Sequence, residues 1–252
     1  MYDKETDRRI HLIDKVLLNV ENRINIIVIG AGGTGSRMIN NLARINIALR
    51  GLGQTEIHIA AYDNDIVEEN NVGRQLFFSD DIGRNKADVV IERVNYAYDF
   101  DWLAIPDKFD MEDRNYNNHI FVTCVDNMET RKGINDIVTG HNYGAGLYWL
   151  DIGNGKDYGQ IALSYHGKNE KNLLTLNQIT KGKYYSIDDS GDDTPSCSLA
   201  VSLNKQSLFI NSILAEYAAN MLFQLLTEYV IDYNGVFINL STLENTRIPI
   251  KK

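Results

Sequence analysis

Apolar residues along this chain form short continuous runs that alternate with longer segments of helical spacing, which is the pattern of an α/β fold. The clearest run, INIIVIG at residues 24–30, is β-branched and almost wholly apolar, as in a parallel strand that is covered on both faces. A helix at 36–50 and a strand at 55–62 complete a strand–helix–strand unit. The pattern then predicts two further helices, at 84–97 and 128–139, and one buried strand between them at 119–125.

The two ends of the chain differ from this alternation. Residues 5–21 carry apolar side chains at helical spacing, so the N-terminal segment 1–23 is expected to contain an amphipathic helix. Its apolar face would consist of Ile10, Leu12, Ile13, Val16 and Leu17. Beyond residue 140, glycines and aromatic residues interleave with β-formers, which predicts strands joined by tight turns. The chain is expected to close with a long helix at 208–231 and a hairpin at 235–250.

These elements predict one doubly wound α/β domain over residues 1–252, with a mostly parallel sheet. Its core would span 24–140, and a β-rich extension would follow over 141–252. Within that extension, the aspartate-rich segment 181–196 has little apolar surface, and we expect a mobile loop there.

Composition excludes several classes of partner. The chain has 252 residues and a formal net charge of −9, which argues against binding to nucleic acid or to an anionic membrane, because either needs clustered Lys and Arg. The most apolar segment, 208–231, is predicted to be a helix with one narrow polar stripe, which includes Asn211. Because it also contains Glu216 and Glu228, we expect a helix buried in the core or at a subunit interface rather than a membrane span. Two cysteines are too few for a disulfide framework or a four-cysteine zinc site. Because no apolar leader stands at the N-terminus either, the cytoplasm is the expected compartment.

The segment GAGGTG, directly after the first strand, carries the first candidate chemistry. It satisfies the spacing G-x-G-x-x-G through Gly30, Gly32 and Gly35, with Gly33 as an additional glycine. Such a turn lets the backbone approach a phosphate and points the N-terminus of the next helix at it. A tight turn without a ligand is the alternative. Asp63, at the end of the second strand, could accept hydrogen bonds from both ribose hydroxyls of NAD or of ATP, so it does not distinguish the two.

Polar side chains that follow Asp63 favour ATP over a dinucleotide. Asn71, Arg74, Gln75 and Lys86 come in close succession. Two cations suit an adenylating site, where negative charge builds on the α-phosphate and pyrophosphate leaves, whereas a hydride-transfer site has little use for them. Surface charges on a loop and a helix are the alternative interpretation for each residue by itself.

A carboxylate follows the third predicted strand. Asp126 lies just past residues 119–125, at the edge where open α/β sheets bind their ligands. It would suit Mg²⁺ bound to a triphosphate, or the alignment of an attacking group. Asn127 and Arg131 are expected to cap and stabilise the following helix.

Taken in order, these motifs resemble the ThiF/MoeB/E1 superfamily of adenylating enzymes. The resemblance covers residues 24–135 through GAGGTGS, DNDIVEENNVGRQ, DIGRNKA and CVDNMETR. Two later segments, 148–163 and 194–215, resemble the ThiF-type protein of PRTRC cassettes in bacterial mobile elements. The superfamily implies a Rossmann-like fold and an enzyme that uses ATP and Mg²⁺ to adenylate the C-terminal carboxylate of a ubiquitin-like β-grasp protein.

Carried over by position, the resemblance also implies roles for single residues. It places around the nucleotide Gly30, Gly32, Gly33, Gly35, Ser36, Asp63, Asp65, Asn71, Arg74, Gln75 and Lys86. Asp126 would lie near Mg²⁺, and Arg74, Lys86 and Asp126 would carry catalysis. The superfamily further implies a homodimer, in which Arg8 or Arg9 would reach across to the partner subunit.

The two cysteines receive different interpretations. Cys124 lies in an apolar strand, where burial raises the pKa of a thiol and makes it inert. Cys197 stands in the sequence PSCS, which resembles an element of E1 enzymes that pass their cargo on as a thioester to an E2-like protein. It would be either a nucleophile that attacks the acyl-adenylate or a free cysteine in a helix cap, and both interpretations stay open. The paired C-x-x-C motifs that hold zinc in many relatives are missing, so no structural zinc is expected.

The sequence therefore predicts an E1-like activating enzyme. Two other functions are the alternatives: a non-catalytic ThiF-like scaffold that binds nucleotide or partner proteins, and an NAD-dependent oxidoreductase. The presence of Arg74, Lys86 and Asp126 argues against the scaffold, and no acid–base residue stands out for the oxidoreductase.

Overall fold

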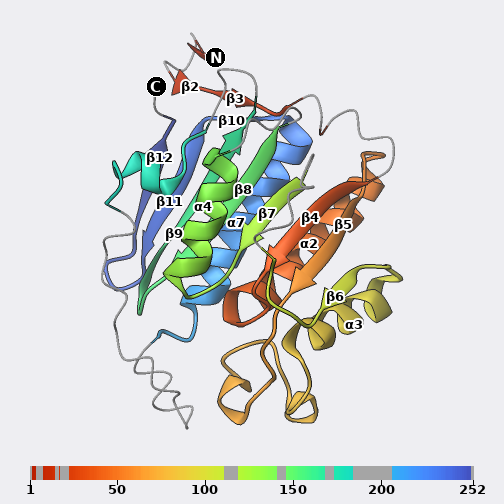
Figure 1. Ribbon diagram of the computed structural model, residues 1–252. Coiled ribbons are helices and arrows are strands. Elements are labelled where there is room, and N and C mark those ends of the chain that lie inside the picture. The colour runs from red at the N-terminus through yellow and green to blue at the C-terminus, as the bar shows by residue number, and fades with distance from the viewer. Residues whose placement is uncertain are drawn as a thin grey trace.

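A mixed eight-stranded sheet forms the centre of the molecule in a computed structural model, which describes residues 2–3, 8–14, 17, 23–110, 119–140, 146–167, 173–183 and 206–250 (Figure 1). The strands lie in the order β12-β11-β9-β8-β7-β4-β5-β6. Their bounds are β4 (Ile24–Ile29), β5 (Ile57–Tyr62), β6 (Leu103–Ile105), β7 (His119–Thr123), β8 (Leu147–Asn154), β9 (Tyr158–His166), β11 (Tyr233–Asn239) and β12 (Glu244–Pro249).

The sheet has a parallel half and an antiparallel half. Neighbouring strands from β6 across to β8 pair in parallel, whereas β9, β11 and β12 pair antiparallel. β4 lies between β5 and β7, and its side chains are buried on both faces, as the apolar sequence predicts. This arrangement confirms the expected doubly wound α/β fold with β-strands in its C-terminal part.

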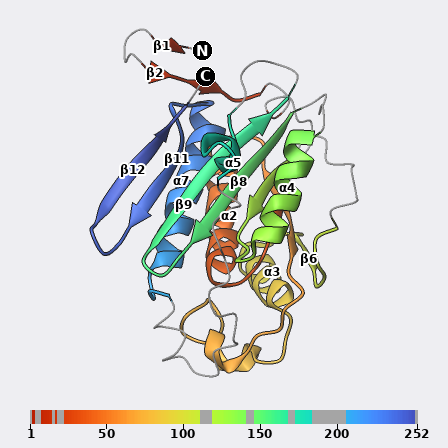
Figure 2. The same cartoon turned by 60° about the vertical axis from the view of Figure 1, so that its left-hand side comes forward.

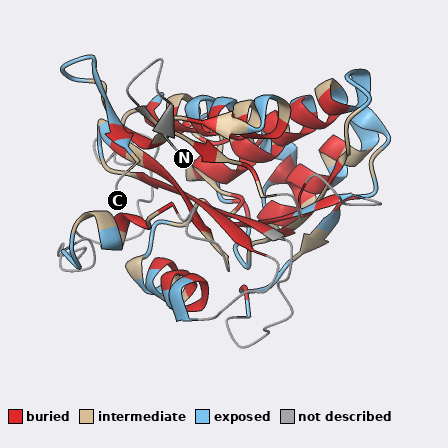
Figure 3. Cartoon of the chain, turned by 90° about the horizontal axis from the view of Figure 1, so that it is seen from above, coloured by how far each residue is buried: buried red, intermediate tan, exposed pale blue. Residues whose placement is uncertain are grey.

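Helices cover both faces of the sheet, so that the molecule has three layers (Figures 2 and 3). α2 (Gly33–Gly51), α3 (Lys86–Tyr98) and α7 (Ile210–Glu228) share one apolar core with one face of the sheet. On the other face lie α4 (Met128–Gly140), which packs in a second core with Ile27 and Trp149, and the short α5 (Leu176–Ile179). No described helix combines the length and the apolar character that crossing a membrane would require.

Part of the N-terminal segment differs from expectation. Residues 8–12 belong to the predicted helix at 5–21 but form β2 (Arg8–Arg9) and β3 (His11–Leu12), whereas Leu17 is helical. β2 pairs with β1 (Tyr2–Asp3), and β3 pairs with β10 (Val230–Ile231), which directly follows α7. A short isolated helix is marginal in water, and here the backbone gains partners from a segment more than 200 residues away, which no local pattern reveals.

Other elements lie close to their predicted bounds. α2 begins at Gly33 rather than residue 36, so the last glycines of the turn belong to the helix. α7 ends at Glu228 because Tyr229 adopts a left-handed conformation with φ of 61°, and the chain then continues as strand β10. The expected loop 181–196 lies outside the described residues from residue 184 onward.

Candidate active site

The glycine-rich turn joins β4 to α2 at the carboxyl edge of the parallel strands (Figure 1). Gly30 has a φ of +93°, and a Cβ there would lie 3.0 Å from the carbonyl oxygen of Cys124. A Cβ on Gly35 would overlap the carbonyl oxygen of Gly30, and a Cβ on Gly33 would lie 2.5 Å from Asn211 Nδ2. The protein's own packing therefore requires glycine at these three positions.

Gly32 is different, because the fold leaves room for a side chain there. The nearest atom to a Cβ on Gly32 would be Gln75 Oε1 at 3.6 Å, an ordinary contact distance. That oxygen is buried and has no hydrogen-bond partner among the described residues. Gly32 also precedes the first turn of α2, whose first N–H groups have no side-chain cap among the described residues. The turn thus offers a ligand both free donors and a bare backbone.

Asp63 turns its carboxylate toward this glycine-rich turn. Its Oδ2 accepts the N–H of Ala31 at 2.6 Å, and its Oδ1 accepts the N–H of Asp65 at 2.9 Å. Burial raises the pKa of this carboxyl above its usual value, although the two backbone donors and Lys86 oppose that shift. Each oxygen keeps a lone pair for a further donor.

Lys86 is placed beside Asp63 by the start of α3. Asn85 caps this helix, since its side chain accepts the N–H of Asp88, and its Nδ2 donates to the carbonyl oxygen of Asp63 at 2.8 Å. The Lys86 ammonium lies 2.8 Å from Asp65 Oδ2 and is buried, with only 9% of the residue exposed. Lys86 thus lies beside the carboxylate of Asp65 and near that of Asp63, which bonds to the turn.

Arg74 is half-buried, and burial lowers its pKa while the negative charge of Asp126 opposes that shift. Its Nη1 donates to Gln206 Oε1 at 3.1 Å, and its Nε is buried without a partner among the described residues. Asp126 is exposed just after β7, and its negative charge acts on the Arg74 guanidinium.

Asn71 and Ser36 are both buried, but they differ in whether their side chains already have hydrogen-bond partners. Asn71 Oδ1 accepts the N–H of Glu68 at 3.0 Å and its Nδ2 donates to Asn70, so its carboxamide shapes the 3₁₀ turn at Glu69–Asn71. The Ser36 hydroxyl is fully buried and has no partner among the described residues.

Of the two residues that were expected to cap and stabilise the following helix, Asn127 does so and Arg131 makes other contacts. Asn127 Oδ1 accepts the N–H of Thr130 at 2.8 Å, which caps α4. Arg131 instead reaches across to β8, where it pairs with Asp151 and donates to the carbonyl oxygens of Val125 and Ile152. Both members of this ion pair are almost fully buried, with 4% and 3% of their side chains exposed. Arg131 therefore anchors the loop that carries Asp126.

The remaining candidate residues are the two cysteines and the arginines near the N-terminus. Cys124 is free, and burial raises its pKa to about 12, in line with the prediction of an inert thiol. Cys197 lies outside the described residues. Arg8 and Arg9 form β2, and their expected reach to a partner subunit stays a prediction.

Two further candidate residues were not predicted from the sequence. Gln206 and Asn211 lie before and within the first turn of α7, yet they contact Arg74 and Thr34 respectively, 132 and 177 residues away in the chain. Only the polar stripe of the predicted helix, which includes Asn211, gave a sign of them.

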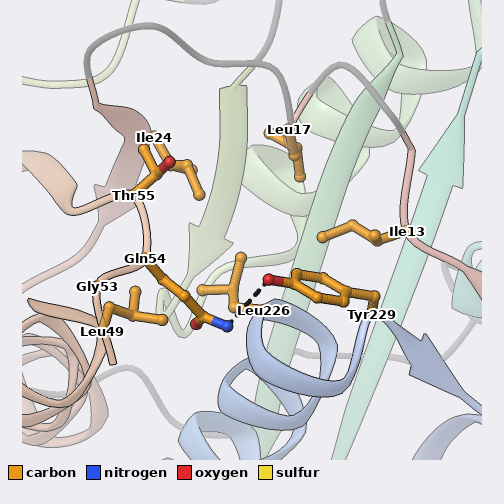
Figure 4. A pocket seen from close by; sticks show the side chains of 9 residues that line it. All are labelled: Ile13, Leu17, Ile24, Leu49, Gly53, Gln54, Thr55, Leu226 and Tyr229. Carbon is orange, nitrogen blue, oxygen red and sulfur yellow. Dashed lines mark hydrogen bonds between the residues drawn. The ribbon is translucent and has the colours of Figure 1, made fainter. Parts of the chain in front are cut away.

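A pocket of about 230 Å³ lies away from this site, beside the first residue of β4 (Figure 4). It is lined mainly by apolar side chains from β4, α2 and α7, such as Ile24, Leu49 and Leu226, and Gln54 Nε2 donates to the Tyr229 hydroxyl at its wall. The described residues contain no group of three or more His, Cys, Asp or Glu that could hold a metal ion.

The chain is 32% identical over 131 residues to the NEDD8-activating enzyme E1 catalytic subunit of Arabidopsis thaliana, which covers 48% of this chain and 26% of that protein. It is 31% identical over 121 residues to the subunit of the same name from Saccharomyces cerevisiae, covering 44% and 36% of the two chains. The chain thus spans between 26% and 36% of the length of these two relatives.

Among solved structures, the fold is similar to that of E. coli MccB, with a TM-score of 0.62 at 19% identity over 94% of this chain and 64% of MccB. A structure of E. coli MccB with ATP has a TM-score of 0.61, also at 19% identity, over 94% and 66% of the two chains. At this identity the likeness shows the fold. Residues 6–252 match the ThiF family, and because this is nearly the whole chain, the protein belongs to that family.

Proposed function

We propose that this protein is an ATP-dependent, E1-like activating enzyme that adenylates the C-terminal carboxylate of a ubiquitin-like β-grasp protein. The observation that carries the proposal is the hydrogen bond between Asp63 and the glycine-rich turn, with the Lys86 ammonium on the neighbouring Asp65. The charge interaction between Arg74 and Asp126 supports it. Membership of the ThiF family supports it, as do relatives named as NEDD8-activating E1 subunits and a neighbour, MccB, whose structure includes ATP.

The residues present fit a nucleotide. A phosphate would lie against Gly32, where the fold leaves space and the first N–H groups of α2 are uncapped. The free lone pairs of Asp63 would accept the ribose hydroxyls, and the unpartnered Gln75 Oε1 would meet a donor. Asp65, Asn71 and Ser36 would complete the surroundings of the nucleotide.

Two cations would act on the phosphates. Arg74 has a buried Nε without a described partner, so its planar guanidinium keeps a donor for a phosphate oxygen. The Lys86 ammonium donates one hydrogen bond to Asp65 and has two further N–H groups for the leaving pyrophosphate.

Asp126 would share Mg²⁺ with the triphosphate. In this proposal the ion would be held jointly by this carboxylate and by phosphate oxygens and water, which are the oxygen ligands that Mg²⁺ prefers. When bound, Mg²⁺ withdraws negative charge from the phosphates.

The reaction is a substitution at phosphorus. A carboxylate oxygen of the β-grasp protein's tail bonds to the α-phosphorus, and the bond from that phosphorus to the bridging oxygen breaks, so that pyrophosphate leaves with the electron pair. Arg74 and Lys86 stabilise the charge that develops, and the protein contributes mainly position and electrostatics.

Further steps are part of the same proposal. The Cys197 thiolate would attack the acyl carbon, forming a thioester as the carbon–oxygen bond to AMP breaks, and the acyl group would then pass to an E2-like protein. The enzyme would act as a homodimer in a PRTRC cassette, and relatives named as NEDD8-activating subunits support a protein substrate.

ATP–pyrophosphate exchange tests the proposal. Labelled pyrophosphate should enter ATP only in the presence of a β-grasp protein with a free C-terminal carboxylate, and the same protein with an amidated C-terminus should be inactive. Arg74→Ala and Asp126→Ala should each lower the exchange rate by about a hundredfold or more. Arg84→Ala, which removes an exposed arginine paired with Glu92, serves as the control. Exchange that persists in Arg74→Ala and Asp126→Ala would refute the assignment.

A further inference from the structure

Two carboxamide side chains at the start of α7 connect Arg74 to the glycine-rich turn. Gln206 Oε1 accepts from Arg74 Nη1 at 3.1 Å and from Asn211 Nδ2 at 3.0 Å. Asn211 Oδ1 accepts from Thr34 Oγ1 at 3.0 Å and from Asn154 Nδ2 at 2.6 Å. This chain of hydrogen bonds joins α2, the end of β8, the start of α7 and the loop that carries Arg74.

The direction of each bond follows from the one before it. A guanidinium has only donors, so Gln206 must present its oxygen to Arg74. The same oxygen then needs a second donor, which is the Asn211 NH₂ group, and this leaves the Asn211 oxygen for the donors on Thr34 and Asn154. Reversing either carboxamide would set two donors or two acceptors against each other, so the network holds Gln206 in one orientation.

Packing fixes the network in place. Asn211 is 2% exposed and Thr34 is 6% exposed, so breaking their bonds would leave buried polar groups without partners. A side chain on Gly33 would collide with Asn211 Nδ2 at 2.5 Å. The additional glycine of the GAGGTG turn therefore makes room for this carboxamide of the protein itself.

We propose that Gln206 is a positioning residue for Arg74, and that Asn211 locks Gln206 in the orientation that allows this. The inference rests on the proposed function, in which Arg74 binds the reacting phosphate. A guanidinium that is already oriented before the nucleotide arrives loses less side-chain entropy on binding, and it needs no rearrangement as charge develops. The start of α7, which shares no sequence motif with the nucleotide site, thereby sets the geometry of catalysis.

Arginine side-chain NMR on the full chain tests the positioning directly, without nucleotide. In the wild type, rotation of the Arg74 guanidinium about its Cζ–Nε bond should be slow, and in Gln206→Met, which keeps the length of the side chain but lacks the acceptor, it should be several-fold faster. The resonance is assigned by its loss in Arg74→Ala. Gln224→Met, the same substitution farther along α7, is the matched control and should leave Arg74 unchanged. Equal rotation in wild type and Gln206→Met would overturn the inference.

A double-mutant cycle tests the consequence for the reaction. Gln206→Met should lower the kcat of ATP–pyrophosphate exchange by about tenfold to a hundredfold while the KM for the β-grasp protein changes less than about threefold. In the Arg74→Ala background the same substitution should change the rate by less than about twofold, because Gln206 acts only through Arg74. Losses that multiply in the double variant would overturn the inference. A wild type that lacks exchange activity would instead refute the proposed function, and the NMR result would still decide whether Gln206 positions Arg74.

Discussion

The buried ion pair between Arg131 and Asp151 offers the sharpest test of how this fold is held together. Arg131→Met would keep much of the side-chain volume but remove the guanidinium from three acceptors: Asp151 and the carbonyl oxygens of Val125 and Ile152. The Asp151 carboxylate, with 3% of its side chain exposed, would keep its hydrogen bond from Thr123 Oγ1 at 2.7 Å but lose its positive partner. We expect this substitution to lower the free energy of unfolding by about 3–5 kcal/mol.

Urea unfolding measures this loss as a shift of the transition midpoint at constant m-value. The double variant Arg131→Met with Asp151→Leu should recover most of the stability, because an apolar pair leaves no uncompensated charge. Arg44→Met, which breaks an exposed pair with Glu216, is the control and should cost less than about 1 kcal/mol. A loss below about 1 kcal/mol in Arg131→Met, or a double variant no more stable than the single one, would refute the reasoning.

Three further predictions concern single side chains. Gly33→Ala should lower the thermal midpoint by several degrees because its methyl group meets Asn211, whereas Gly32→Ala should unfold like the wild type but bind ATP at least tenfold more weakly. Equal thermal midpoints for the two variants, or unaltered ATP binding in Gly32→Ala, would contradict this prediction. In a Cys197→Ser variant, Cys124 should react with a thiol reagent at pH 8 only after unfolding, because burial raises its pKa to about 12; rapid reaction of the native protein would show that the thiol is accessible. Burial lowers the pKa of His166 to about 4, below the unfolded value near 6.5, so the unfolded chain binds the proton first. Stability should therefore fall by about 2.5 kcal/mol as pH drops from 6.5 to 4, and His166→Phe should remove this dependence in urea titrations at each pH.

Local patterns in the sequence predicted the parts of the fold that depend on neighbours in the chain. The apolar run at Ile24–Ile29 became the strand with parallel partners on both sides, and the turn after it carries the uncapped helix start, because strand burial and glycine geometry are encoded within a few residues. Asp63 also follows from its place at the end of the next strand, where it bonds to the turn.

The rest depends on contacts that only the folded chain creates. The strand at His11–Leu12 exists because Val230 and Ile231 lie beside it, and spacing within residues 5–21 carries no trace of that pairing. Asn211 lies in a segment with apolar helical character and Gln206 lies just before it, so their contacts with Arg74 and Thr34 could not be read from periodicity. Arg131 was expected to support its own helix, but its acceptors come from the loop before that helix and from β8.

The packing of α2 against α7 has a consequence for how the protein is made. The face of α2 that contains Met38 and Leu42 joins the same apolar core as Leu214 and Leu222 of α7, about 180 residues later in the chain. During vectorial synthesis, the ribosome delivers the whole parallel half of the sheet before this cover emerges. Apolar surface of α2 therefore stays open to water until residues 210–228 have emerged, which makes the nascent chain a natural client for holding chaperones.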